Sequence, residues 1–292
     1  MKGALLKGLL YFLGHLPLRT NHALGGFIGW LLWLFPTREK NTSLINLAKC
    51  FPEQSQEWRN KIARKSLIET GKTLTESPVL WYASKERIHS LVTGISDMQA
   101  VDRAMGLSRG AILVSPHIGS WEMTGLYSAS LYPMTSLYQK PKIKELDHLL
   151  KQARQTTGST LVPTTPSGLK QLNRALANRE CIGILPDQEP KGSGGVFAPF
   201  FGVPAYTMTL LMRLASIQKT PIIFSFAERL PKGKGYYLHI VVPDENIYDP
   251  DPEIAATALN ATVEEVIRLR PEQYMWNYKR FKRRPPGEAA FY

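Results

Sequence analysis

The chain has 292 residues, of which 43% are hydrophobic, and it carries a formal net charge of +12 with a pI near 9.6. This length and apolar content suit one large α/β domain or two small ones, and exclude a disordered chain. The basic excess indicates an acidic partner, which could be nucleic acid, anionic lipid or an acidic carrier protein. The two cysteines, Cys50 and Cys181, lie outside any CxxC, which excludes a disulfide framework and favours a reducing compartment.

Two apolar runs open the chain, at residues 4–16 and 24–35. Neither run reaches the ~20 residues that span a bilayer, and no small-residue cleavage site follows as in a secretory signal. A helical pair lying in the membrane interface and one helix from about Asn21 that barely spans both remain open. We expect residues 1–36 to form an N-terminal apolar helical membrane anchor and residues 37–292 to form one domain. A buried helix pair of a soluble domain is the alternative.

Helical and strand patterns alternate along the rest of the chain. Residues 110–115 and 181–186 are short continuous apolar runs, typical of strands buried on both faces. Further strands are expected at 134–139, 161–163, 221–226 and 236–242. Helices are expected at 57–92, 120–131, 143–157, 167–178, 207–218 and 254–269, and a glycine- and proline-rich loop at 187–204. This order predicts an α/β fold with a mixed, largely parallel sheet flanked by helices.

A histidine follows the first buried strand. Pro116 stops this strand, so His117 falls in the turn at its carboxyl end, where open α/β sheets bind ligands. Glu122 lies five residues on, and within one helix the two side chains would diverge by ~140°. They can meet only if His117 precedes a helix that starts near Ser120. Such a pair can work as a general base whose tautomer the carboxylate fixes. A structural loop histidine is the alternative.

Several blocks of the chain resemble a known family. They are SPHIGSWE at 115–122, PDQEPKGSGGVFAPFFG at 186–202 and PEQYMWNYKRFKRRPPG at 271–287. With the apolar N-terminus, they resemble the lipid A biosynthesis lauroyl/myristoyl acyltransferases of Gram-negative bacteria, members of the HX4D/E acyltransferase superfamily. Glu122 stands where that superfamily often has the shorter Asp.

The resemblance implies a glycerolipid-acyltransferase-like fold and a defined reaction. A fatty acyl chain would pass from acyl carrier protein to a hydroxyl of a lipid A precursor, with His117 as general base oriented by Glu122. The resemblance also implies the cell inner membrane, an active site on its cytoplasmic face, and no metal or redox cofactor.

Other polar residues are candidates for substrate binding. Arg154 lies on the helix at 143–157, where the family has an arginine, and could neutralise a phosphate or an oxyanion. Asp187 ends the second buried strand and could orient a sugar hydroxyl or Arg154. Arg280 and Lys282 belong to a basic C-terminal block that suits lipid phosphates or an acidic carrier protein. A solvated helical arginine and a turn aspartate are the structural alternatives for Arg154 and Asp187.

Other functions fit parts of this pattern. A glycerolipid or ornithine-lipid O-acyltransferase would use the same histidine and carboxylate, and a non-catalytic basic lipid-binding protein would need neither. Nucleic acid is not expected as a partner, because no RRM, zinc or helix-turn-helix signature accompanies the basic block.

Overall fold

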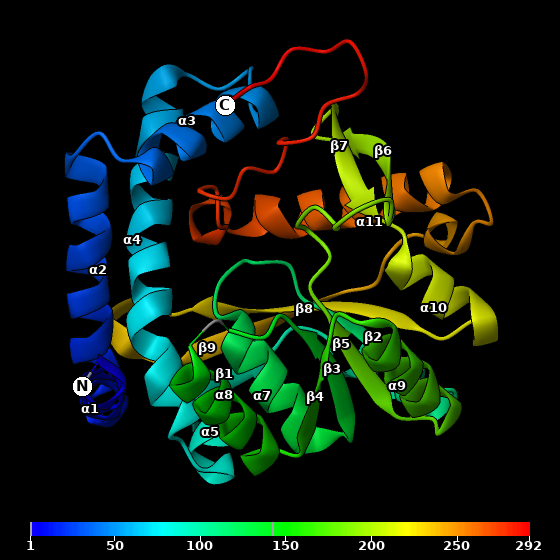
Figure 1. Cartoon of the computed structure of the whole chain (residues 1–292), viewed down its shortest axis with the longest axis horizontal. Helices are drawn as coiled ribbons and strands as arrows, with labels where there is room; N and C mark the ends of the chain where they lie inside the picture. Colours follow the sequence, from blue (N-terminus) through cyan, green and yellow to red (C-terminus); the bar gives the residue numbers. More distant parts are fainter. Residues whose placement is uncertain (1, 142) are drawn as a thin grey trace.

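The computed structural model describes residues 2–141 and 143–292, and its centre is a seven-stranded sheet with the order β1-β9-β8-β2-β5-β3-β4 (Figure 1). The strands are β1(Val92–Ile95), β2(Ala111–Val114), β3(Met134–Tyr138), β4(Ser159–Pro163), β5(Cys181–Ile184), β8(Ile222–Arg229) and β9(Tyr236–Val241). Neighbouring strands are parallel except β8 and β9, which are antiparallel. The predicted α/β fold with a mixed, largely parallel sheet is therefore confirmed.

Helices cover both faces of this sheet. They are α1(Lys2–His15), α2(Leu18–Leu34), α3(Arg38–Cys50), α4(Gln56–Trp81), α5(Lys85–Leu91), α6(Met98–Gly106), α7(Trp121–Leu131), α8(Lys144–Thr156), α9(Pro166–Ala177), α10(Leu210–Gln218) and α11(Pro252–Leu269), with short 3-10 helices η1(Pro231–Gly233), η2(Glu245–Tyr248) and η3(Pro271–Gln273). Alternate residues of β2 point to opposite faces. Ile112 and Val114 join the core formed with α9, α10 and α11, whereas Ala111 and Leu113 pack with Ala129 of α7.

Two segments differ from the sequence prediction. The helix expected at 57–92 is two helices, because α4 ends at Trp81 and Ser84 caps α5 by accepting a hydrogen bond from the Arg87 backbone. The loop expected at 187–204 contains part of a hairpin, β6(Gly195–Phe200) and β7(Val203–Met208), which packs against α11 (Figure 1). Phe201 and Gly202 both have positive φ, as a two-residue hairpin turn of type I′ requires.

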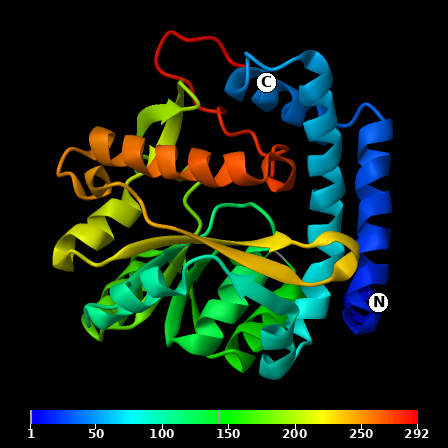
Figure 2. The ribbon, with the colours of Figure 1, turned by 180° about the vertical axis from the view of Figure 1, so that it is seen from behind.

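The N-terminal helices pack along α4, and α2 lies beside α4 in both views (Figures 1 and 2). Glycines make this contact close: a Cβ on Gly71 of α4 would lie 2.0 Å from the carbonyl oxygen of Gly25 in α2. No helix within residues 2–141 and 143–292 is long and apolar enough to cross a bilayer. Of the two arrangements left open for the predicted N-terminal anchor, the spanning helix therefore finds no support.

Candidate active site

Two adjacent parallel strands place His117 beside Asp187. The register pairs Val114 of β2 with Ile184 of β5, and each strand is followed by one residue, a proline and then the polar residue. His117 and Asp187 therefore follow two neighbouring, paired strand positions by the same number of residues. Both lie at the carboxyl edge of the sheet, where α/β enzymes bind ligands.

His117 is hydrogen-bonded through its ring and its backbone. Its Nδ1 lies 2.8 Å from Oδ1 of Asp187, and its backbone N–H donates to Oδ2 of the same carboxylate at 3.0 Å. The Nε2 atom lies 3.2 Å from the side-chain nitrogen of Gln188. Because an ionised carboxylate only accepts and an amide nitrogen only donates, these contacts fit a neutral imidazole with its proton on Nδ1. Nε2 then carries the free lone pair.

Asp187 is buried, with 3% of its surface exposed. Burial is the largest influence on the pKa of Asp187 and raises it, but the electrostatic interaction with His117 and the two hydrogen bonds from His117 together lower it more. The pKa of Asp187 is therefore below its usual value. The carboxylate is ionised at neutral pH and can hold the imidazole in one tautomer.

Glu122 lies in the first turn of α7 and contacts other partners. Its Oε1 accepts from Nη2 of Arg154 at 2.8 Å, and its Oε2 accepts from the indole N–H of Trp81 at 3.0 Å. The expectation that Glu122 orients His117 is thus corrected, because Asp187 and Gln188 contact the two ring nitrogens. The helix α7 begins at Trp121, so Glu122 lies in its first turn. From there its carboxylate reaches Arg154 of α8 and Trp81 of α4 instead of His117.

Arg154 packs against the backbone of α7 at a glycine. A Cβ on Gly125 would lie 2.7 Å from Nη1 of Arg154, so a larger residue there would shift the guanidinium from this position. Its Nε is buried, and the described part of the chain offers it no hydrogen-bond acceptor. The alternative of a solvated helical arginine does not apply, since the side chain is 13% exposed.

A cavity of about 240 Å³ opens beside these residues. Its polar lining residues include Ser115, Glu122 and Arg154. Trp121 also lines it, and the Trp121 ring lies 5.0 Å from the His117 ring, centroid to centroid. The rest of the lining is mostly apolar and includes Leu113, Met134, Leu137, Leu150, Leu161 and Ile184. The site thus combines an oriented imidazole, a guanidinium and an apolar cavity.

The two basic C-terminal candidates have different surroundings. Arg280 is buried, and its guanidinium donates to the carbonyl oxygen of Tyr206 at 2.8 Å and to the Thr207 hydroxyl at 2.9 Å. Its donors face the hairpin, which does not support the prediction that Arg280 binds substrate. Lys282 is exposed, and its role stays a prediction.

Sequence reasoning missed Gln188 and Trp81, and gave Asp187 a different partner. The signal for Asp187 was present, because AILVSPH and CIGILPD place a polar residue at the same offset from two buried strands. No signal pointed to Trp81, which reaches Glu122 from a helix 41 residues earlier in the chain.

The chain is similar to bacterial acyltransferases over nearly all its length. Residues 4–283 match the bacterial lipid A biosynthesis acyltransferase family. The lipid A biosynthesis lauroyltransferase of Escherichia coli K12 is 29% identical over 98% of this chain and 92% of its own length. The palmitoleoyltransferase of the same strain is 28% identical, with the same coverage, and its myristoyltransferase is 25% identical over 87% of this chain and 78% of its own. The chain therefore belongs to the bacterial lipid A biosynthesis acyltransferase family and is an acyltransferase.

Proposed function

We propose that this enzyme transfers a fatty acyl chain from acyl carrier protein to a hydroxyl of a lipid A precursor, with His117 as the general base and Asp187 as the residue that orients it. The observation that carries this proposal is the 2.8 Å contact between Nδ1 of His117 and the buried Asp187 carboxylate, next to a largely apolar cavity. Membership of the family supports a lipid A precursor as acceptor. The reaction needs no metal or redox cofactor.

The proposed chemistry uses the free lone pair of the imidazole. A hydroxyl is a weak nucleophile, so Nε2 of His117 takes its proton as the oxygen attacks the thioester carbonyl carbon. The imidazolium that forms is stabilised by Asp187. When the C–S bond breaks, the proton returns from Nε2 to the departing thiolate. The acceptor supplies the nucleophile, and the enzyme contributes orientation, proton transfer and charge.

In this scheme Arg154 stabilises the negative charge that develops during the reaction, and Glu122 positions Arg154. Charge develops on the thioester oxygen in the transition state, and a fixed donor aimed at it typically lowers the barrier by ~3–4 kcal/mol. The Glu122 carboxylate and the Gly125 backbone hold the Arg154 guanidinium at the cavity, and its Nε lacks an acceptor among the described residues. Glu122 is therefore proposed as the residue that positions Arg154.

Gln188 covers the atom that has to work as the base. Its amide nitrogen stands 3.2 Å from Nε2 of His117, the position that the acceptor hydroxyl must take. We propose that the acceptor displaces this side chain on binding. Gln188 is partly exposed, so its side chain has room to move.

The surface of α1 and α2 supports a site at a membrane. Large apolar side chains are exposed there, among them Leu5, Leu9, Phe12, Phe27, Trp30, Leu34 and Phe35. A patch of this kind marks an interaction surface, and aromatic residues suit the headgroup boundary. Its α1 end lies next to the end of α4, because the Tyr11 ring is 5.8 Å from the ring of Tyr82, which follows Trp81 in the chain. We propose that α1 and α2 lie in the cytoplasmic face of the inner membrane.

The exposed basic residues Lys282 and Arg283 complete the proposed substrate surface. Either the phosphates of the lipid acceptor and its bilayer or the acidic carrier protein could meet these charges. We favour the acceptor, because the apolar surface of α1 and α2 already indicates a lipid interface.

Acyl transfer by the purified enzyme tests the proposal. Acyl carrier protein loaded with a saturated acyl chain is incubated with a lipid A precursor, a lysophospholipid or a lyso-ornithine lipid, or with no acceptor, and products are separated by mass spectrometry. Acylation of the lipid A precursor that His117→Ala abolishes is expected. Preferential transfer to another lipid would show that this lipid, not the lipid A precursor, is the acceptor. Full activity of His117→Ala would contradict the proposed mechanism.

A further inference from the structure

The turn that carries His117 is held by segments distant in sequence. It connects β2 to α7 and lies outside both. Gly119 N–H donates to the carbonyl oxygen of Gln273 at 3.0 Å, and Ser120 N–H donates to the carbonyl oxygen of Ala227 at 2.8 Å. Contact with β8 is close, because a Cβ on Gly119 would lie 2.1 Å from the Ala227 oxygen. The place of the imidazole therefore depends on η3 and on the end of β8.

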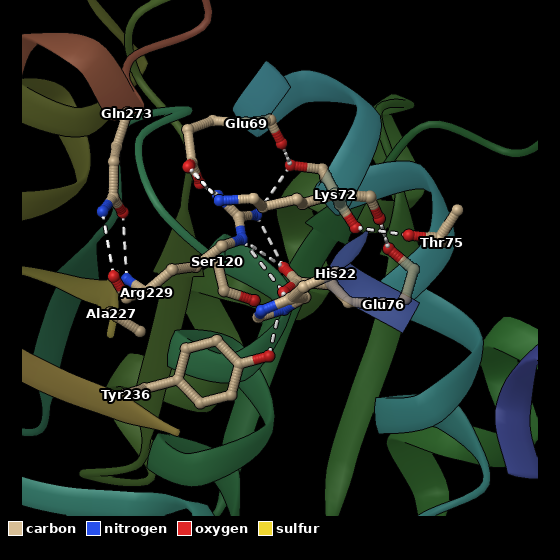
Figure 3. A network of polar contacts seen from close by, with 12 residues as sticks. His22, Glu69, Lys72, Thr75, Glu76, Ser120, Ala227, Arg229, Tyr236 and Gln273 are labelled. Atoms are coloured by element: carbon tan, nitrogen blue, oxygen red, sulfur yellow. Dashed lines mark hydrogen bonds and ion pairs between the residues drawn. The ribbon is translucent and has the colours of Figure 1, made fainter. Parts of the chain in front are cut away.

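Gln273 joins these two anchors to each other. Its side-chain oxygen accepts from the backbone N–H of Arg229 at 2.9 Å, and its side-chain nitrogen donates to the Arg229 carbonyl oxygen at 3.0 Å. Its own carbonyl oxygen accepts from Gly119. One buried side chain thus fixes the end of β8, while the backbone of the same residue fixes the turn. Figure 3 shows the paired hydrogen bonds between Gln273 and Arg229.

Arg229 is in turn held by a buried ion pair. Its Nε lies 2.9 Å from both carboxylate oxygens of Glu76 on α4, and its Nη2 lies 2.6 Å from Oε1. Glu76 and Arg229 are 1% and 4% exposed. A pair this deep stabilises a fold only when its other hydrogen-bonding groups also have partners, because removing both charges from water is costly.

Neighbouring side chains supply those partners. His22 of α2 lies 2.8 Å from Oε2 of Glu76, and the Tyr236 hydroxyl donates to the same oxygen at 2.9 Å. Nη2 of Arg229 also donates to the Thr73 hydroxyl at 2.6 Å. The ion pair is therefore fixed from α2, α4 and β9 together, and its geometry leaves Arg229 little freedom.

We propose that Gln273 is a positioning residue for acyl transfer, and that the Glu76–Arg229 ion pair is the fixed point from which it holds the His117 turn. This inference rests on the proposed role of His117 as base. It gives a purpose to the PEQ segment of the C-terminal block, which the proposed chemistry leaves unused. A displacement of ~1 Å at a reacting group can cost on the order of 10²-fold in rate, so anchoring the turn has a direct effect on turnover.

Gln273→Met is the first test, because methionine keeps the length and volume of glutamine and removes both side-chain hydrogen bonds. We expect kcat to fall at least tenfold, while the Michaelis constants for acyl donor and lipid acceptor stay within twofold. Kinetics are measured well below the melting temperature, on protein whose circular dichroism equals that of the unaltered enzyme.

Asn260→Leu is the matched control. Asn260 is 2% exposed, and its amide donates to the Pro199 carbonyl oxygen at 2.8 Å and to the Thr207 hydroxyl at 2.9 Å, far from the turn in sequence and without contact to it. It should lower the melting temperature and leave kcat unchanged. If Gln273→Met also lowers only the melting temperature, Gln273 is merely structural and the inference fails. If the Gln273→Met protein does not fold, Gln273→Asn takes its place, and its changes in kcat and melting temperature are compared with those of Asn260→Leu.

A double variant separates positioning from independent effects. Asp187→Asn and Gln273→Met both act through the orientation of His117, so together they should lose less than the product of their single losses in kcat. A full product of losses would contradict the inference. His117→Ala distinguishes the two proposals. If His117→Ala keeps its activity, the proposed role of His117 as base is wrong. If His117→Ala loses its activity while Gln273→Met keeps full activity, only the positioning role of Gln273 is wrong.

Discussion

Nδ1 of His117 and the carboxylate of Asp187 are joined twice, since Oδ1 contacts the ring nitrogen at 2.8 Å and Oδ2 accepts the backbone N–H of the same histidine at 3.0 Å. A carboxylate bound in this way fixes both the ring and the peptide that carries it. Asp187 is therefore placed to set the tautomer of the imidazole and the position of Nε2.

Gln188 is expected to be replaceable. Its amide covers Nε2 of His117 but takes no part in the proposed proton transfer. Gln188→Ala should keep kcat within about threefold and leave the Michaelis constant for the acceptor unchanged or lower, because the acceptor no longer has to displace the amide. Steady-state kinetics with varied acceptor measure this. A loss near the ~10²–10⁴-fold typical of general acid–base groups would place Gln188 among the reacting groups instead.

Membrane binding should depend on the aromatic surface of α2. Phe27 and Trp30 are 56% and 42% exposed, with stacked rings. Burying one such side chain contributes ~1.5–3 kcal/mol, so Phe27→Ser with Trp30→Ser should weaken binding to vesicles more than tenfold. Cosedimentation with vesicles of anionic and zwitterionic lipid measures it. Ile217→Ser on α10, 67% exposed, is the control. Equal binding of the unaltered protein, the α2 double variant and Ile217→Ser would argue against α2 as the membrane surface.

The two basic C-terminal candidates should respond differently to loss of charge. Arg280→Gln should destabilise the fold by about 2 kcal/mol or more, because hydrogen bonds from a buried charge to Tyr206 and Thr207 are lost. Lys282→Gln should leave stability unchanged and raise the Michaelis constant for the acceptor, with an effect that fades as salt rises. Urea denaturation and kinetics at two salt concentrations check this. A raised constant for acyl carrier protein alone would assign Lys282 to the donor.

Acid should destabilise the protein through its buried carboxylates. Burial, the largest influence, raises the pKa of Glu76, but the Arg229 charge and the hydrogen bonds from His22 and Arg229 lower it far below its usual value. The pKa of Asp187 is also lowered. Groups with a depressed folded pKa stabilise fully above the unfolded pKa of about 4, and this stabilisation is lost as pH falls below it.

Urea denaturation from pH 7 to pH 3 measures this loss. The free energy of unfolding should change little between pH 7 and 5 from these groups, and fall steeply below about pH 4. Glu76→Gln should cost ~3–5 kcal/mol at pH 7, because Arg229 is left buried without its partner. That cost should shrink below about pH 4, because the Glu76 carboxyl of the unaltered protein then gains a proton when the chain unfolds. A cost independent of pH would show that the charge of Glu76 contributes nothing.

The sequence predicted the sheet and the place of His117, because both follow from local patterns. AILVS and CIGIL are short apolar runs typical of doubly buried strands, and a proline follows each of them. The pairing of His117 was mispredicted because the nearest carboxylate in sequence, Glu122, was preferred. Strand order decides the matter, and nothing local shows that β5 rather than β3 lies beside β2.

Other features depend on contacts that a single sequence does not reveal. The sequence shows that the N-terminal runs are apolar, but it does not show that Gly25 and Gly29 are where α2 meets α4. Arg280 reads as part of a basic surface block, and only the fold of the hairpin shows that its guanidinium is buried. In both cases the partner lies far away in the chain.

The turnover of Asp187→Asn compared with that of Glu122→Gln tests the central claim most directly. Both variants exchange a carboxylate for an amide of the same size, and kcat is measured with saturating acyl carrier protein substrate and lipid A precursor. If Asp187 orients the base, Asp187→Asn should lose ~10²–10⁴-fold in kcat, because an amide no longer fixes the Nδ1–H tautomer. Glu122→Gln should lose much less, since its amide oxygen still accepts from Arg154 or Trp81. The reverse order, with Glu122→Gln the more damaged and Asp187→Asn nearly fully active, would contradict the account.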